Sequence, residues 1–243
     1  MENTVTKFGH LLKGNKLVTI LEMVIVFIPG FFIVHINSGI ENSPVIKMIV
    51  IWMANVTMLF LVWSSIKLRR ERLSDYGITF GRMSMKEGLR TLGRSLLVCV
   101  IAGAAYVLGT MIMMNISGAP ETADMSNYDY LRNNFFMFLL TLTGVYIVSS
   151  FGEEVIYRAF LINRFRELGL DGTPGRILAV ILAAVIFGLV HYEWGLTGIV
   201  STGLMGLVMG LFYLKYNKNI WILVLAHAYL DTILLVPLFL GSH

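Results

Sequence analysis

The sequence contains a single cysteine among its 243 residues, Cys99, which lies within an apolar run. One cysteine excludes a disulfide framework within the chain and a CxxC zinc site, so we expect Cys99 to serve packing alone. Charged residues are also scarce, at 14%, against about a quarter in soluble domains. Because 56% of the residues are hydrophobic and the mean hydropathy is +0.74, this composition indicates a membrane protein.

The apolar stretches lack the alternation of apolar and polar residues that a transmembrane β-barrel requires. They instead reach roughly 20 residues, the length with which a helix crosses a bilayer. We expect no cleavable signal peptide, because the first stretch is too long and no small-residue cleavage pattern follows it. The sequence predicts one all-α domain, 1–243, a polytopic membrane bundle with its motif-bearing core at about 133–240. The predicted membrane spans, about seven in number, are residues 17–36, 45–66, 95–114, 133–157, 176–193, 196–214 and 220–240.

Basic residues lie in alternate connections between these spans, and acidic residues lie in one of the opposite connections. The positive-inside rule then places the N-terminus in the cytosol and the C-terminus outside. The net charge of +4 therefore serves orientation, and we expect no nucleic-acid partner. The 67–94 connection is either an amphipathic segment on the membrane surface or a solvated loop. The charges that predict this orientation include Lys7, Lys13, Lys16, Arg82, Lys86, Arg90 and Arg94 on one side and Glu121, Asp124 and Asp129 on the other.

Ionisable residues inside the spans stand out, because such residues are costly in a membrane and usually mark function. The candidates are Glu22, Glu153, Glu154, Arg158, His191, Glu193, His227 and Asp231. Glu154 and Arg158 are four residues apart and share one helix face. We expect Glu22 to pair structurally with Arg158 or a histidine, in preference to a catalytic part, and Glu193 to lie at the membrane interface. Gly206 and Gly210 have the small-xxx-small spacing of closely packed helices.

Spacing also predicts that the polar groups meet. A helical hairpin centred on Gly172 places Glu153 and His191 at the same depth, because each lies 19 residues from the turn. For His227 to reach them, the hairpin must project somewhat past the bilayer on its cytosolic side. A carboxylate held away from water becomes an effective general base, and imidazoles stabilise a developing oxyanion. The pattern favours hydrolysis of an amide bond by an activated water.

Three segments, "EEVIYR", "FGLVH" and "HAYLD", resemble the EExxxR, FxxxH and HxxxN/D motifs of the CAAX protease and bacteriocin-processing family, also called CPBP or Abi. This family of intramembrane endopeptidases includes the type II CAAX prenyl endopeptidase. The resemblance implies that Glu153 activates water with the help of His191, while His227 stabilises the tetrahedral intermediate. It implies catalytic residues Glu153, Glu154, His191, His227 and Asp231, with Arg158, Phe187 and Tyr157 shaping the site.

The last motif position, often Asn in the prenyl-protein proteases, is Asp231 here. An ionised Asp cannot donate a hydrogen bond, so Asp231 is protonated, orients His227, or helps to hold a metal. We expect no cofactor, with zinc as the alternative on His191, His227, Glu153 and Asp231. Other protease signatures (HExxH, GxGD and GxSxG) do not occur in the sequence.

The expected partners are membrane lipids and a peptide or lipidated-protein substrate, with no prediction of oligomeric state. A compact chain without eukaryotic retention signals favours the plasma membrane of a bacterium, with the site opening to the cytosol. The substrate would be a prenyl-protein-like chain, a bacteriocin or a signal-peptide precursor, or the bacteriocin itself in a self-immunity role. The alternatives are a non-catalytic scaffold that binds a sensor kinase or transporter, and a transporter with a proton relay. The absence of an inverted repeat disfavours the transporter.

Overall fold

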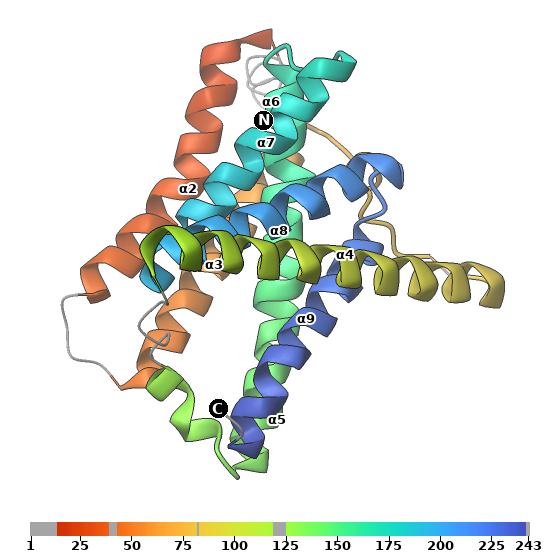
Figure 1. Ribbon diagram of the computed structural model, residues 1–243. Coiled ribbons are helices and arrows are strands. Elements are labelled where there is room, and N and C mark those ends of the chain that lie inside the picture. Colours follow the sequence, from red (N-terminus) through yellow and green to blue (C-terminus); the bar gives the residue numbers. More distant parts are fainter. Residues whose placement is uncertain (1–13, 39–42, 82, 119–124, 242–243) are drawn as a thin grey trace.

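A computed structural model describes residues 14–38, 43–81, 83–118 and 125–241, which form helices and connections with no strand (Figure 1). The predicted all-α membrane bundle is confirmed. Its principal helices are α2 (Lys16–Ser38), α3 (Pro44–Leu68), α4 (Met85–Ser117), α7 (Thr173–Leu189), α8 (Gly195–Lys215) and α9 (Ile220–Leu240). Short 3-10 helices lie in the connections: η1 (Leu73–Tyr76), η2 (Met125–Leu131) and η5 (Tyr192–Trp194).

The fourth span is a continuous helix of 33 residues, Phe135–Glu167. Its parts are α5 (Phe135–Val145), the π-helical η3 (Tyr146–Phe151) and η4 (Glu154–Leu161), and α6 (Ile162–Glu167). The predicted end at residue 157 is therefore wrong, because the charged residues that follow are buried in ion pairs and continue the helix. At about 1.5 Å per residue the helix is roughly 50 Å long, more than the roughly 30 Å hydrocarbon core. This length agrees with the projection that the hairpin spacing requires.

Two other predicted boundaries are wrong. The third span begins at Met85 and not at residue 95, because a capping box starts the helix there: Ser84 Oγ accepts from the Glu87 N–H, and the Glu87 carboxylate accepts from the Ser84 N–H. The 67–94 connection therefore divides into a 3-10 turn and the first turns of α4. The fifth span ends at Leu189, so α7 has 17 residues and is shorter than the six helices of the described chain that are long and apolar enough to cross a membrane.

The helices pack around α8, which lies against α4 and α7, while α4 also packs on α9 and α2 on α3. In Figure 1, α4 and α8 run across the bundle, and α5 lies side by side with the part of α9 that leads to the C-terminus. The close packing predicted for two α8 glycines is present. A Cβ at Gly210 would lie 2.6 Å from Val180 Cγ1, and one at Gly206 would lie 2.8 Å from Phe187 Cδ1. Cys99 is buried in the core, as expected.

A buried charged network joins α2, α3 and α6. Glu22 Oε2 lies 2.7 Å from Arg69 Nη1 and 3.3 Å from Arg164 Nε, and both arginines are fully buried. The structural pairing expected for Glu22 is confirmed, but the prediction of Arg158 or a histidine as its partner is wrong. The remaining members of the network are Ser65, Glu71, Tyr76 and Glu167.

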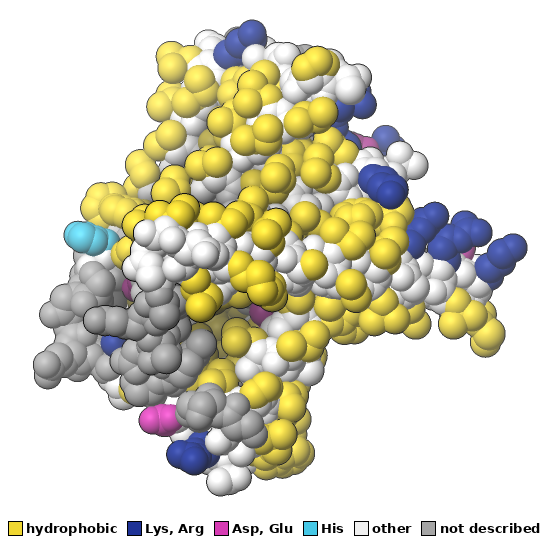
Figure 2. Space-filling view, in the orientation of Figure 1, with side chains coloured by type: hydrophobic (Ala, Val, Ile, Leu, Met, Phe, Trp, Pro, Cys, Tyr) yellow, Lys and Arg dark blue, Asp and Glu magenta, His cyan; other side chains and the backbone are white. Residues whose placement is uncertain are grey.

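The structure describes only some of the charged residues from which the orientation in the membrane is predicted. Figure 2 shows hydrophobic side chains over most of one face, with lysines and arginines gathered at the N-terminal end of α4. Several charges that predict the orientation (Lys7, Lys13, Arg82, Glu121 and Asp124) lie outside the described residues. The orientation in the membrane stays a prediction.

Candidate active site

The first motif lies in a π-helical part of the fourth span. Glu153 follows η3, and Glu154 opens η4. A π-helix hydrogen-bonds from residue i to residue i+5, so it is wider than an α-helix, and π-helical turns occur frequently at functional sites. The sequence predicts an ordinary α-helix for this segment, and the change of helix type is seen only in the folded chain.

Glu154 is wholly buried and contacts the guanidinium of Arg158 and the imidazole of His227. Its Oε1 lies 3.0 Å from Arg158 Nη1 and accepts a hydrogen bond from His227 Nδ1 at 2.9 Å. The pairing with Arg158 is the one that their spacing indicates. Because a buried carboxylate is tolerated only when it is paired, these contacts tie the fourth span to α9 and fix the tilt of the imidazole.

The other side of the His227 imidazole faces two more carboxylates. Glu153 Oε2 lies 3.9 Å from His227 Nε2, and Asp231 Oδ1 lies 3.8 Å from the same atom. Both separations exceed a direct hydrogen bond and suit one bridging water. The structure thus places both Glu153 and Asp231 beside His227 Nε2, whereas the hairpin spacing concerns Glu153 and His191.

Phe187 is the aromatic centre of the cluster. Its ring, 1% exposed, meets the ring of Tyr157 at 5.0 Å, that of His191 at 4.8 Å and that of His227 at 6.5 Å between centroids. The Arg158 guanidinium lies over the same ring at 4.2 Å. Phe187 therefore contacts residues of both motifs and packs α7 against the fourth span.

His191 lies just beyond the end of α7, and its position differs from the prediction of a helical residue. Its Nδ1 donates to the Phe187 carbonyl oxygen at 2.7 Å, which assigns the proton to Nδ1 and leaves Nε2 as an acceptor. Its ring contacts are with Phe187 and with Trp194 at 5.1 Å. The structure places His191 at the edge of the cluster, against the Phe187 ring. Glu193 is exposed in η5, as expected of an interfacial residue.

The residues named for the zinc alternative do not form a metal site. Within the described part of the chain, no three His, Cys, Asp or Glu side chains are arranged to hold a metal ion. That the reaction needs no metal stays a prediction.

Two serines of the site were missed from the sequence. Ser150 is fully buried, and its Oγ donates to Asp231 Oδ2 at 2.7 Å. Ser149 Oγ donates to Glu153 Oε1 at 3.3 Å. The four-residue spacing of Ser149 and Glu153 was a local signal, whereas Ser150 and Asp231 are 81 residues apart and carried none.

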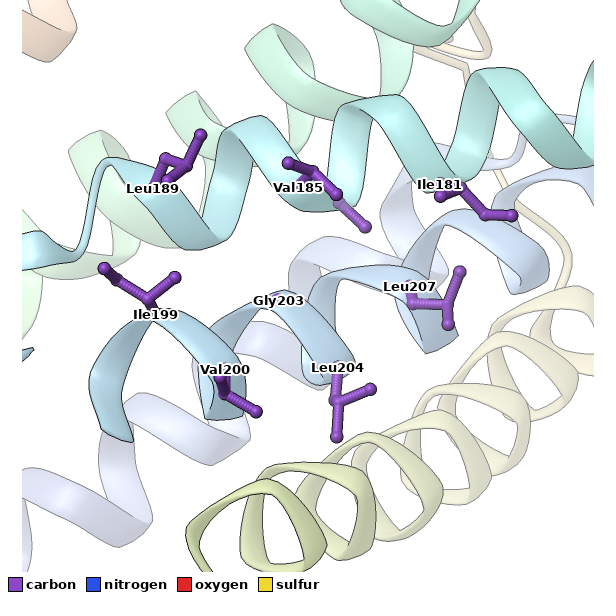
Figure 3. Close-up of a pocket in the computed structure, with 9 residues that line it drawn as sticks. Ile181, Val185, Leu189, Ile199, Val200, Gly203, Leu204 and Leu207 are labelled. Carbon is purple, nitrogen blue, oxygen red and sulfur yellow. The ribbon is translucent and has the colours of Figure 1, made fainter. Parts of the chain in front are cut away.

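A pocket of about 290 Å³ lies between α7 and α8, apart from this cluster (Figure 3). Its lining is apolar and includes Ile181, Val185, Leu189, Ile199 and Leu204. None of the residues that line it is a predicted site residue, and none carries a group that could transfer a proton. The pocket is therefore not the reactive centre.

These features define a class: a multi-pass helical membrane protein with a buried cluster of carboxylates, imidazoles and one guanidinium inside its bundle. A family model described as type II CAAX prenyl endopeptidase Rce1-like matches residues 135–233, about two fifths of the chain and all three motifs. No curated protein and no solved structure matches. The match supports the resemblance to the CAAX protease family over residues 135–233, and the family that it names is one of proteases.

Proposed function

We propose that the protein is an intramembrane endopeptidase that hydrolyses a peptide bond in a membrane-associated peptide or lipidated protein. The observation that carries the proposal is the arrangement at His227 Nε2, which faces Glu153 Oε2 at 3.9 Å and Asp231 Oδ1 at 3.8 Å. A general base beside an imidazole provides the acid–base groups that hydrolysis by an activated water needs.

In the proposed reaction, Glu153 takes a proton from the water, and the resulting hydroxyl adds to the carbonyl carbon of the substrate. His227 donates through Nδ1 to Glu154, so it must be in the imidazolium form to carry a second proton on Nε2, and this Nε2–H donates to the oxyanion that develops on the carbonyl oxygen. The protonated Glu153 then gives its proton to the leaving nitrogen as the C–N bond breaks, which yields a carboxylic acid and an amine. His191 is assigned to hold the water through Nε2.

This route uses no metal, and the alternative is zinc on His191, His227, Glu153 and Asp231. Prolonged dialysis against a chelator distinguishes the two, because activity that survives it with no bound zinc excludes the metal route. We further propose that the site opens to the cytosolic side of a bacterial plasma membrane. Bacteriocin or signal-peptide precursors, prenyl-protein-like chains, or a bacteriocin in self-immunity are the proposed substrates.

The test uses the purified protein in lipid nanodiscs with two internally quenched peptides, one farnesylated and ending in a CAAX sequence, one unmodified. Glu153→Gln should lower the cleavage rate by about 10²–10⁴-fold, the usual contribution of a general base. Glu193→Gln is the matched control, since Glu193 is exposed and lies next to the segment of His191. If the wild type cleaves neither peptide, or if Glu153→Gln cleaves as fast as the wild type, the proposal fails. A cellular phenotype that survives Glu153→Gln would favour the scaffold.

A further inference from the structure

Each of the two carboxylates that face His227 has one oxygen held by a serine and the other directed at the imidazole. Asp231 accepts from Ser150 at Oδ2 and lies 3.8 Å from His227 Nε2 at Oδ1. Glu153 accepts from Ser149 at Oε1 and lies 3.9 Å from the same nitrogen at Oε2. The two serines are adjacent in the π-helical η3, so one segment holds both carboxylates.

The Ser150 contact is the stronger of the two. Its length of 2.7 Å is typical of a hydroxyl that donates to a carboxylate, while the Ser149 contact is longer at 3.3 Å. Ser150 is 0% exposed, and a buried hydroxyl without a partner is costly. The hydroxyl and the carboxylate therefore hold each other, and the rotation of Asp231 about its side-chain bonds is restricted.

This contact also bears on the role of Asp231. A carboxylate that accepts from Ser150 at one oxygen still offers the other oxygen to accept from the His227 Nε2–H through a bridging water. His227 is held at its opposite nitrogen by Glu154 Oε1 at 2.9 Å. Two acceptors on opposite edges of the ring define its plane and the direction of the Nε2–H.

We propose that Ser150 is a positioning residue: it orients Asp231, and through Asp231 it fixes the direction in which His227 presents its Nε2–H. The inference rests on the proposed function, because it adds a residue to the same site. Among the alternatives for Asp231, it selects the one in which Asp231 orients the histidine, and the oxyanion donor is then His227.

The first experiment compares Ser150→Ala with Ser201→Ala. Ser201 is also 0% exposed and makes a hydrogen bond of 2.9 Å with Thr110, but it lies on α8 away from the cluster. We expect Ser150→Ala to lower kcat by about ten- to a hundredfold, the scale of a small misplacement of a reacting group. KM should change by less than about twofold, because ground-state binding is untouched. An unchanged kcat, or an equal loss in Ser201→Ala, would overturn the proposal.

The second experiment does not depend on activity. The ¹⁵N resonances of the His227 imidazole, assigned by comparison with His227→Gln, are measured in the same nanodiscs. Ser150→Ala should shift the Nε2 resonance, and Ser201→Ala should not. In an Asp231→Ala background, Ser150→Ala should produce no further shift, because its route to the imidazole has been removed.

The two experiments separate the proposals. If the wild type cleaves no probe peptide but Ser150→Ala moves the His227 resonance through Asp231, the endopeptidase assignment fails and the positioning role stands. If the resonance does not move in Ser150→Ala, or moves by the same amount without Asp231, the positioning role is wrong whatever the activity.

Discussion

Replacing Gly206 with alanine should disturb the site without touching an ionisable residue. Gly206 lies on α8, and a Cβ there would approach Phe187 Cδ1 to 2.8 Å and Arg158 Nη2 to 3.4 Å. The first distance is shorter than real Cβ contacts allow, so the Phe187 ring must move. The ring has little room, because Tyr157 and His191 pack against it at 5.0 and 4.8 Å.

Two opposing terms set the size of the effect. Overpacking a well-packed core costs about 1–3 kcal/mol. Alanine favours the helical state over glycine by up to about 1 kcal/mol. The net expectation is a destabilisation of about 0–2 kcal/mol, together with a displacement of the Arg158 guanidinium and the His191 ring. Cleavage should therefore fall by more than the loss of folded protein explains.

Thermal unfolding in detergent and peptide cleavage at a fixed amount of folded protein measure the two effects. Gly93→Ala is the matched control. Gly93 lies in α4, and no described atom of a neighbouring residue comes within 4 Å of the position that an added Cβ would take, so alanine there should be neutral or stabilising by up to about 1 kcal/mol. If Gly206→Ala behaves like Gly93→Ala in both assays, the close approach of α8 to Phe187 is not as described.

Two further predictions concern the buried network around Arg69 and Arg164. Glu22→Ala should lower the free energy of unfolding by about 3–5 kcal/mol, because it leaves a buried arginine pair short of a carboxylate; a change in thermal midpoint no larger than that of Gly93→Ala would contradict this. Burial acts to raise the pKa of Glu71, but Arg164, the Tyr76 hydroxyl and Arg69 outweigh it, and the pKa is lowered from 4.5. The ionised Glu71 carboxylate therefore stabilises the fold above pH 4.5, and this stabilisation is lost as the pH falls through the lowered pKa. The free energy of unfolding, measured against pH, should show this loss for the wild type and not for Glu71→Gln.

The arrangement of helices was largely predictable, because apolar length and the cost of bare backbone in lipid leave few alternatives. The error at the end of the fourth span arose because charged residues continue the helix there. Arg164 and Glu167 resemble a loop in sequence, yet they lie in α6, and their partners, Glu22, Arg69 and Glu71, come from distant segments. No local pattern records such long-range pairing.

The sequence predicts which residues form the site better than it predicts how they are arranged. The pairing of Glu154 with Arg158 follows from spacing, but the hairpin spacing predicts Glu153 level with His191, and the imidazole that Glu153 faces is that of His227. The π-helical turns were not predictable, since they depend on how the fourth span packs. Ser150 was missed for a related reason, because only the folded chain brings it to Asp231.

The shortness of α7 has a consequence for the surrounding lipid. Its 17 residues span about 25 Å, several Å less than a typical hydrocarbon core. In a bilayer of ordinary thickness, we expect the acyl chains beside α7 to compress, at a cost that grows with membrane thickness. His191 follows two residues after the end of this helix, so we expect the thickness of the bilayer to act on the depth of that imidazole.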